Sequence, residues 1–166
     1  SRAILLTDDE AFAERVQAET EKQLEALARK EIAAYSVENS GGVILVKDMD
    51  AACELANRIA PEHLELATED PEELLPKIRN AGAVFMGKWT SEPVGDYFAG
   101  PDHTLPTGGT ARFFEVLNQD IFLRKMSVIK YGERAIREDA EDIIRLAEAE
   151  GLSAHANAVR VRAKEE

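Results

Sequence analysis

The chain has 166 residues, the size of one domain or of one domain with an appendage. It carries 20 Lys and Arg against 32 Asp and Glu, so its formal net charge is -12, which repels phosphate backbones and anionic lipids. We therefore expect no nucleic acid and no membrane as partners, and no apolar run approaches the roughly 18 residues of a membrane span. The single cysteine, Cys53, cannot form an intrachain disulfide, which fits a reducing, cytoplasmic compartment.

Strand-like and helical patterns alternate from the first residues. Ala3–Thr7 has strand character, and apolar residues recur at helical spacing over Ala11–Leu27. Ser36–Gly42 is predicted to be a break, and Gly42–Val46 is typical of a buried strand because it is apolar throughout. The elements that follow are a helix, a strand, a short helix and a buried strand, over residues 48–60, His63–Ala67, Pro71–Gly82 and Ala83–Gly87.

This alternation predicts an α/β fold with a mainly parallel sheet. We expect an incomplete Rossmann-like parallel sheet flanked by helices, with a C-terminal helical tail. Residues 1–131 would form the partial α/β domain and residues 132–166 the tail. Ligands of such sheets bind beyond the carboxyl ends of the strands. The segment from Lys88 onward leaves one of these ends, so we expect the chemistry there.

The C-terminal part has a different pattern. Met126–Tyr131 is strand-like, Glu133–Glu150 is an amphipathic helix, and Gly151 separates it from a second helix with Ser153 as the expected N-cap. This tail has few apolar residues of its own. Such an arm is more stable when it is docked, and a second subunit is the partner that we expect.

Several polar residues occur where chemistry is plausible. His63 follows Glu62 between a helix and a strand, where an imidazole that titrates near neutral pH suits proton removal from a hydroxyl group and a carboxylate suits activation of water. Asp96 lies in the segment Gly95–Phe113, which is rich in glycine and proline and is predicted to form neither helix nor strand. Its carboxylate can ligate a divalent metal, and His103 of the same segment can donate a hydrogen bond to a substrate.

Each of these residues also has an ordinary structural explanation. Glu62 and His63 suit an exposed loop, and Asp96 suits a turn, because Asp side chains bond to nearby backbone amides. His103 suits a capping or packing role. Glu150 and His155, on either side of a helix junction, suit either a cation site or a solvated helix end. Taken one at a time, the residues leave these alternatives open.

Five separated segments together resemble one enzyme family, histidinol dehydrogenase, in their order and spacing. The segments are APEHLEL (Ala60–Leu66), NAGAVFMG (Asn80–Gly87), VGDYFAGPDHTLPTGGTARF (Val94–Phe113), MSVIKY (Met126–Tyr131) and LSAHANAV (Leu152–Val159). The resemblance covers essentially the whole chain. It implies oxidation of L-histidinol to L-histidine through an aldehyde, in two NAD-dependent steps, with a bound zinc (Zn2+).

The resemblance also implies roles for individual residues. His63 matches the general base of the alcohol oxidation, and Glu62 matches the residue that activates water in the aldehyde step. Asp96 matches a zinc ligand, and His155 matches a zinc ligand supplied by the partner subunit of a homodimer with exchanged tails. The substrate-contacting positions match His103 and Glu150. The NAD contacts cannot be assigned to residues of this chain.

The family's proteins are longer, and this chain resembles only their C-terminal portion. In the family, a Gln and a His that complete the zinc site, and most NAD contacts, precede the region matched here. We therefore expect this chain alone to be inactive and to need the N-terminal portion. Two alternatives are a non-catalytic half-domain, excised or engineered, that dimerises without zinc or NAD, and a split enzyme completed by a separate chain.

Overall fold

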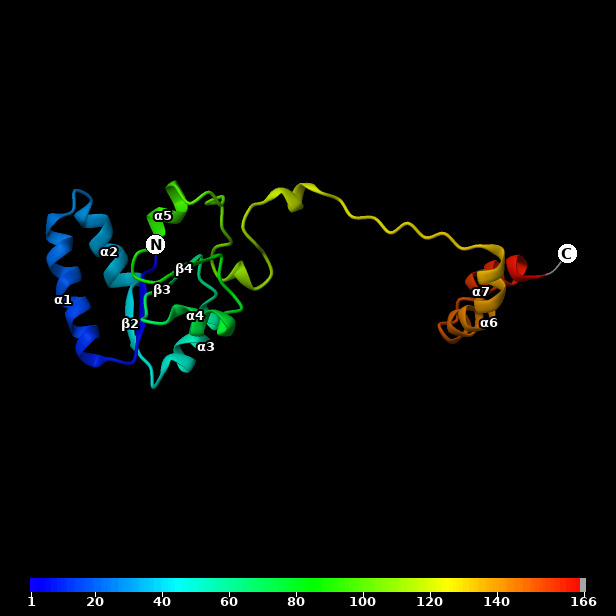
Figure 1. Ribbon diagram of the computed structural model, residues 1–166, viewed down its shortest axis with the longest axis horizontal. Helices are drawn as coiled ribbons and strands as arrows, with labels where there is room; N and C mark the ends of the chain where they lie inside the picture. Colours follow the sequence, from blue (N-terminus) through cyan, green and yellow to red (C-terminus); the bar gives the residue numbers. More distant parts are fainter. Residues whose placement is uncertain (165–166) are drawn as a thin grey trace. The chain divides into compact units, whose positions relative to one another are not determined.

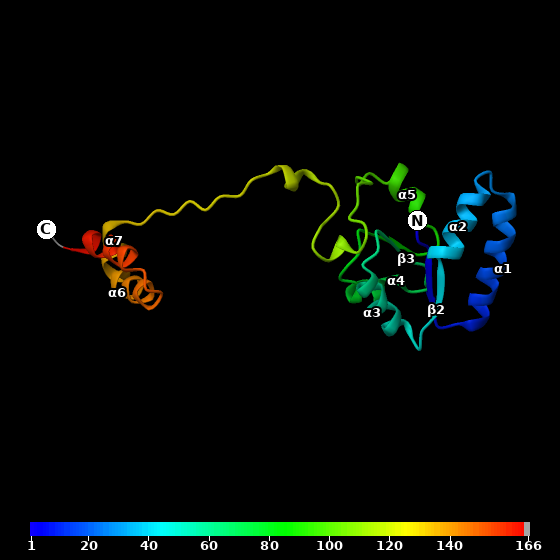
Figure 2. The ribbon, with the colours of Figure 1, turned by 180° about the vertical axis from the view of Figure 1, so that it is seen from behind.

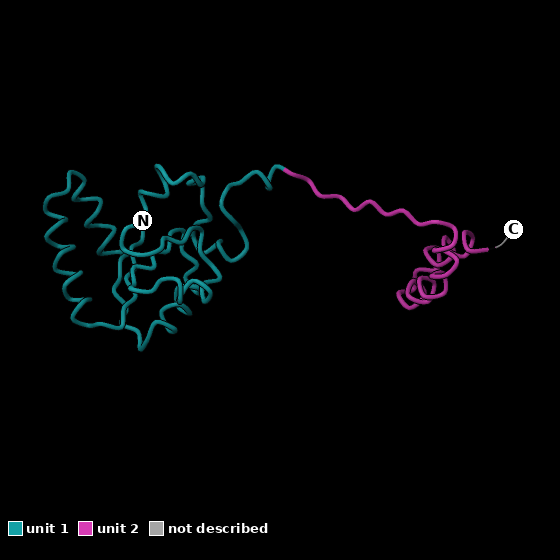
Figure 3. Tube along the Cα trace, viewed as in Figure 1, with its two compact units in different colours: residues 1–122 teal, residues 123–166 magenta. Residues whose placement is uncertain are grey.

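The computed structural model describes residues 1–164. The chain forms two compact units, Ser1–Phe122 and Leu123–Glu166, which Figure 3 shows in teal and magenta. In the described residues, no helix combines the length and the apolar character that crossing a membrane requires.

Unit 1 begins with a parallel strand pair and a helical hairpin. β1 (Ile4–Thr7) pairs in parallel with β2 (Gly42–Leu45), and α1 (Glu10–Ala26) and α2 (Lys30–Ser40) connect them. Figures 1 and 2 both show the two helices side by side. The predicted break at residues 36–42 is wrong, because α2 continues to Ser40. The predicted burial of the second strand is also wrong, because all four residues of β2 are exposed.

The second half of unit 1 contains the buried core. α3 (Met49–Ile59) precedes β3 (His63–Leu66), and α4 (Pro71–Leu74) with a 3-10 turn leads to β4 (Ala83–Met86), which pairs in parallel with β3. Within the described residues the strands therefore form two separate parallel pairs. The predicted mixed α/β fold with parallel strands and a helical C-terminal end is confirmed. The core cluster consists of Cys53, Leu66 and Leu74, with Met49, Leu64, Ile78, Val84 and Met86 packed against it.

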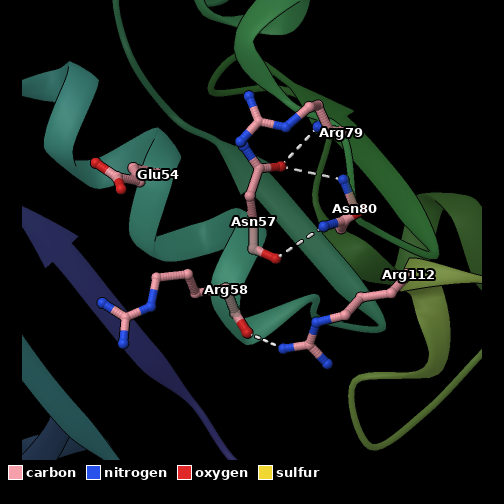
Figure 4. A pocket seen from close by; sticks show the side chains of 6 residues that line it. All are labelled: Glu54, Asn57, Arg58, Arg79, Asn80 and Arg112. Atoms are coloured by element: carbon pink, nitrogen blue, oxygen red, sulfur yellow. Dashed lines mark hydrogen bonds between the residues drawn. The ribbon is translucent and has the colours of Figure 1, made fainter.

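One buried polar side chain, Asn57 of α3, connects this helix to the chain that leads into β4. Its amide nitrogen donates to the carbonyl of Lys77 at 2.8 Å, and its amide oxygen accepts from the backbone N–H of Arg79 and of Asn80 at 2.6 and 3.0 Å. Asn80 in turn donates to the Asn57 carbonyl, as Figure 4 shows. The entry of β4 is therefore fixed to α3 by hydrogen bonds from a side chain that is only 4% exposed.

Unit 2 is a helical hairpin preceded by extended chain. α6 (Glu133–Ala149) packs against α7 (Ser153–Ala163), with Ala140 and Ala156 buried between them. Residues 126–131 form neither helix nor strand, so the strand-like prediction for Met126–Tyr131 is wrong. Leu152, rather than Ser153, occupies the N-cap position of α7.

Candidate functional site

His63 and Asp96, two of the residues that the sequence singles out, lie in contact. The Nε2 atom of His63 is 3.3 Å from Oδ1 of Asp96. Both side chains are half-buried, with 25% and 22% of their surface exposed. The His63 ring also packs against Phe85 of β4, with the ring centroids 5.7 Å apart. The imidazole is therefore held between a carboxylate and an aromatic ring.

Asp96 reaches this position because it lies on a helix. α5 (Glu92–Tyr97) follows β4, which contradicts the prediction that the segment around Asp96 forms no helix. Pro93 is compatible with the first helical turn, because the amide hydrogen that proline lacks has no intrahelical partner there. Gly95 is required by packing. A Cβ atom at this position would lie 2.5 Å from Cε1 of Phe85, so only glycine lets α5 sit directly on β4.

Glu92 completes this group and was not predicted from the sequence. Its Oε1 atom is 3.9 Å from Nε2 of His63, and ligand-type atoms of Glu92, His63 and Asp96 all lie within 4.8 Å of one another. The pKa of Glu92 is raised above its ordinary value, because its carboxyl hydrogen-bonds to Asp96, is partly desolvated and lies beside the Asp96 charge. The available signal was the four-residue spacing of Glu92 and Asp96, which puts them on one helix face.

The site lies at the amino end of β3, not beyond its carboxyl end as predicted. His63 is the first residue of β3. Glu62, directly before it, is half-buried, and its carbonyl accepts a 2.9 Å hydrogen bond from Ala83 of β4. At the same end, Pro106 lies so close to Gly82 that a Cβ atom there would be 3.2 Å from the proline ring. The chain after β4 therefore returns along the strands and carries Asp96 back to His63.

The loop that contains His103 is anchored near this end. Arg112 donates from its guanidinium to the carbonyls of Gly109 and of Arg58, the latter near the end of α3 (Figure 4). His103 itself is exposed, three residues before the buried Pro106. Among residues 1–164 no hydrogen bond or ion pair joins His103 to His63 or Asp96, so its substrate-binding role stays a prediction.

The remaining predicted residues lie in unit 2. Glu150 is exposed at the C-cap of α6, and His155 is exposed in the first turn of α7. The structure brings together only His63 and Asp96 of the predicted set, with Glu62 next to His63 in the chain. Whether Glu150 and His155 join them from a second copy of the chain stays a prediction.

The donor set of this site fits a zinc ion in part. Asp96 offers a half-buried carboxylate, and carboxylate oxygens and imidazole nitrogens are ordinary zinc ligands. A stable zinc site uses three or four protein ligands. The two ligands that the resemblance implies, Asp96 and His155 of a second copy, are fewer than that, whereas His63, Glu92 and Asp96 of unit 1 bring three ligand-type atoms within 4.8 Å of one another. The contacts to NAD stay unassigned among residues 1–164.

The comparisons with known proteins identify the family. The family model described as histidinol dehydrogenase matches residues 1–163. A protein named histidinol dehydrogenase from Heliobacterium mobile is 52% identical over 160 residues, which are 96% of this chain and 38% of that protein. One of the same name from Geobacter metallireducens is 53% identical over 164 residues, covering 99% and 38%. The crystal structure of histidinol dehydrogenase from Elizabethkingia anophelis matches with a TM-score of 0.88 and 40% identity, over 98% of this chain and 37% of that one.

The structure defines a mixed α/β protein with a histidine–carboxylate site. The chain belongs to the histidinol dehydrogenase family, because the family model and these relatives match nearly its whole length. It spans about 38% of the length of these relatives and corresponds to their C-terminal portion.

Proposed function

We propose that this chain is the part of a histidinol dehydrogenase that supplies the general base, the water-activating carboxylate and part of the zinc site. The reaction is the NAD-dependent oxidation of L-histidinol to L-histidine in the cytoplasm. The observation that carries the proposal is the contact of His63 with Asp96, at 3.3 Å, inside a chain about half identical to proteins of that name.

His63 is suited to remove the hydroxyl proton of the alcohol. A neutral imidazole accepts the proton at a ring nitrogen, and NAD, when bound, would take up the hydride that the carbon releases. The ring then carries a positive charge, which the carboxylates of Asp96 at 3.3 Å and Glu92 at 3.9 Å stabilise. Phe85 packs against the ring and limits its rotation.

Glu62 is suited to the second oxidation. The aldehyde becomes an acid only after water adds to it, and a carboxylate that takes a proton from this water makes it a better nucleophile. Asp96, with His155 of a second copy, would hold the zinc, which when bound orients the substrate through its imidazole and amine. His103 and Glu150 of the proposed exchanged dimer would contact the substrate.

Exposed aromatic side chains before and at the end of α5 support a further partner. Trp89, Tyr97 and Phe98 are 84%, 81% and 94% exposed, although side chains of this size contribute most when they are buried. The N-terminal portion that the relatives possess is the partner that we propose for this surface. The chain alone would then be inactive.

A mixing experiment tests the proposal. The chain is combined with the N-terminal portion of the Heliobacterium mobile relative, and NADH formation from L-histidinol is followed by absorbance. We expect turnover in the mixture and none from either part alone, and His63→Gln should lower kcat at least about 100-fold. A mixture of folded, associated parts without turnover would contradict the proposed activity and favour a non-catalytic half-domain. Turnover by the chain alone would contradict its dependence on the other portion.

A further inference from the structure

The face of β3 that carries His63 also carries a second acidic residue, Glu65. Successive side chains of a strand point to opposite faces. Leu64 and Leu66 belong to the core, so His63 and Glu65 project together from the other face. They are separated by about 6.6 Å along the strand, two residues at about 3.3 Å each.

Two residues of α5 contact these two residues of β3. Glu92 and Asp96 are four residues apart, so they lie on one face of the helix and about 6 Å apart along its axis. Oε1 of Glu65 accepts a 3.0 Å hydrogen bond from the backbone N–H of Glu92, and Nε2 of His63 meets Oδ1 of Asp96 at 3.3 Å. The two pairs run in opposite chain directions, so α5 lies antiparallel to β3 and is held at both ends.

The Glu65 carboxylate accepts from a backbone amide that has no partner within the helix. Ser91 is the N-cap residue of α5, but its side chain makes no capping hydrogen bond. Pro93 has no N–H, and Val94 donates to the Ser91 carbonyl at 3.0 Å. The Glu92 amide is therefore the donor at the start of α5 that needs an acceptor from outside the helix, and Glu65 supplies it.

The contact of Gly95 with Phe85 still allows α5 to slide along the strands, and Glu65 restricts this motion. Gly95 lies directly on the Phe85 ring, and Phe85 is the register partner of Glu65 on β4. This contact sets how closely α5 approaches the strands, but one flat ring does not fix its position along them. A six-residue helix is too short to be stable by itself, so its placement depends on such contacts.

We propose that Glu65 is a positioning residue, whose carboxylate holds the first amide of α5 and thereby sets the distance between His63 and Asp96. The effect of this distance on turnover rests on the proposed function. The contact of the Glu65 carboxylate with the Glu92 amide, which we call the clamp, concerns the fold of unit 1 and can be measured without substrate.

The clamp is tested in the chain itself with Glu65→Ala and Glu65→Gln. Glutamine keeps the acceptor oxygen, whereas alanine removes it. We expect hydrogen exchange of the Glu92 amide, followed by NMR, to accelerate at least about tenfold in E65A and to stay near the wild-type rate in E65Q. The control is Glu69→Ala, an exposed glutamate beyond β3, which should leave the rate unchanged. Equal exchange in E65A and wild type overturns the proposal.

Kinetics in the mixture with the N-terminal portion test the consequence. A displacement of reacting groups by about 1 Å costs up to 100-fold in rate. We therefore expect E65A to lower kcat by about 10- to 100-fold, with a smaller change in KM, and E65Q to recover most of the loss. Wild-type kinetics in E65A overturn the positioning role. If instead the wild-type mixture shows no turnover while E65A still accelerates Glu92 exchange, the proposed function fails and the clamp stands.

Discussion

Asn57 shows how much of unit 1 depends on a single polar side chain. Its side-chain amide bonds to backbone groups of Lys77, Arg79 and Asn80, which lie in the 3-10 turn and the irregular chain before β4. Side-chain amides commonly occupy turns and helix ends, so the sequence around Asn57 does not predict that its side chain connects α3 to the chain before β4. The role follows only from the position of Asn57 on the buried face of α3.

Asn57→Ala should destabilise unit 1 strongly. The substitution leaves one carbonyl and two amide groups without their partner, and each unsatisfied buried group costs about 1–3 kcal/mol. Water reaches part of this site, so we expect a loss of about 3 kcal/mol in the free energy of unfolding, measured by urea denaturation. Asn157→Ala, an exposed change on α7, is the control and should have no measurable effect. An equal, small effect of both variants would show that the Asn57 hydrogen bonds contribute little.

At the residue scale, the sequence identified His63 and Asp96 but not Glu92 or Glu65. The two identified residues belong to motifs of the family. Glu92 and Glu65 act through their places on α5 and on the outer face of β3, and the prediction contained no helix at Glu92–Tyr97. The strand containing Glu65 was predicted, but its partner on α5 was not. Missing one short helix therefore hid both of these carboxylates.

At the scale of elements, α2 is a helix that the sequence pattern does not favour. α2 contains Ser36, Asn39 and Ser40, which are typical of turns. In the structure Ser36 donates to the Ser1 carbonyl, and Asn39 donates to the Tyr35 carbonyl one turn earlier. These bonds satisfy the side chains within or beside the helix. The predicted strand and helix order was otherwise right for β1, α1, α3, β3 and β4.

The capping of α3 gives a dependence of stability on pH. The Asp48 side chain accepts a 2.8 Å hydrogen bond from the Ala51 amide, which lowers the pKa of Asp48 below its ordinary value. A carboxyl with a lowered pKa in the folded state stabilises the fold above its ordinary pKa, and this contribution is lost as the pH falls through the folded value. Asp48→Ala should therefore lower the urea midpoint modestly at pH 7, and the difference from wild type should shrink below about pH 4. A difference that is constant from pH 7 to pH 3 would contradict this role of the charge.

The close contact of α5 with β4 predicts that adding one methyl group at Gly95 destabilises the fold. Gly95→Ala would place a Cβ atom 2.5 Å from the Phe85 ring, so the helix or the ring must shift. We expect a loss of about 1–3 kcal/mol in the free energy of unfolding and a displaced α5. Gly42→Ala is the matched control, because nothing lies within 4 Å of a Cβ atom there. Equal midpoints of the two variants in urea would show that α5 does not pack against Phe85 in solution.

At the scale of the whole molecule, exposed apolar side chains mark the extended chain with which unit 2 begins. Met126, Val128 and Ile129 are 81%, 87% and 83% exposed, in extended backbone without a strand partner in the described residues. The sequence predicted a strand here because it is rich in β-branched residues, but a strand needs a neighbour for its backbone hydrogen bonds. The composition of this segment thus favours a strand, but within the described residues no neighbouring strand is present to pair with it.

Limited proteolysis tests the proposed tail exchange. Arg124, Lys125 and Lys130 lie in this exposed segment, so trypsin should cleave there first in dilute solution and separate the two units. If the tails exchange in a homodimer, the segment is covered as the dimer forms, and the initial cleavage rate per chain should fall as the protein concentration rises. Phe12→Ala, an exposed change on α1, is the control and should leave this concentration dependence unchanged. Sedimentation at the same concentrations reports the dimer directly. A dimer that is cleaved in this segment as fast as the monomer would show that the chains associate through another surface.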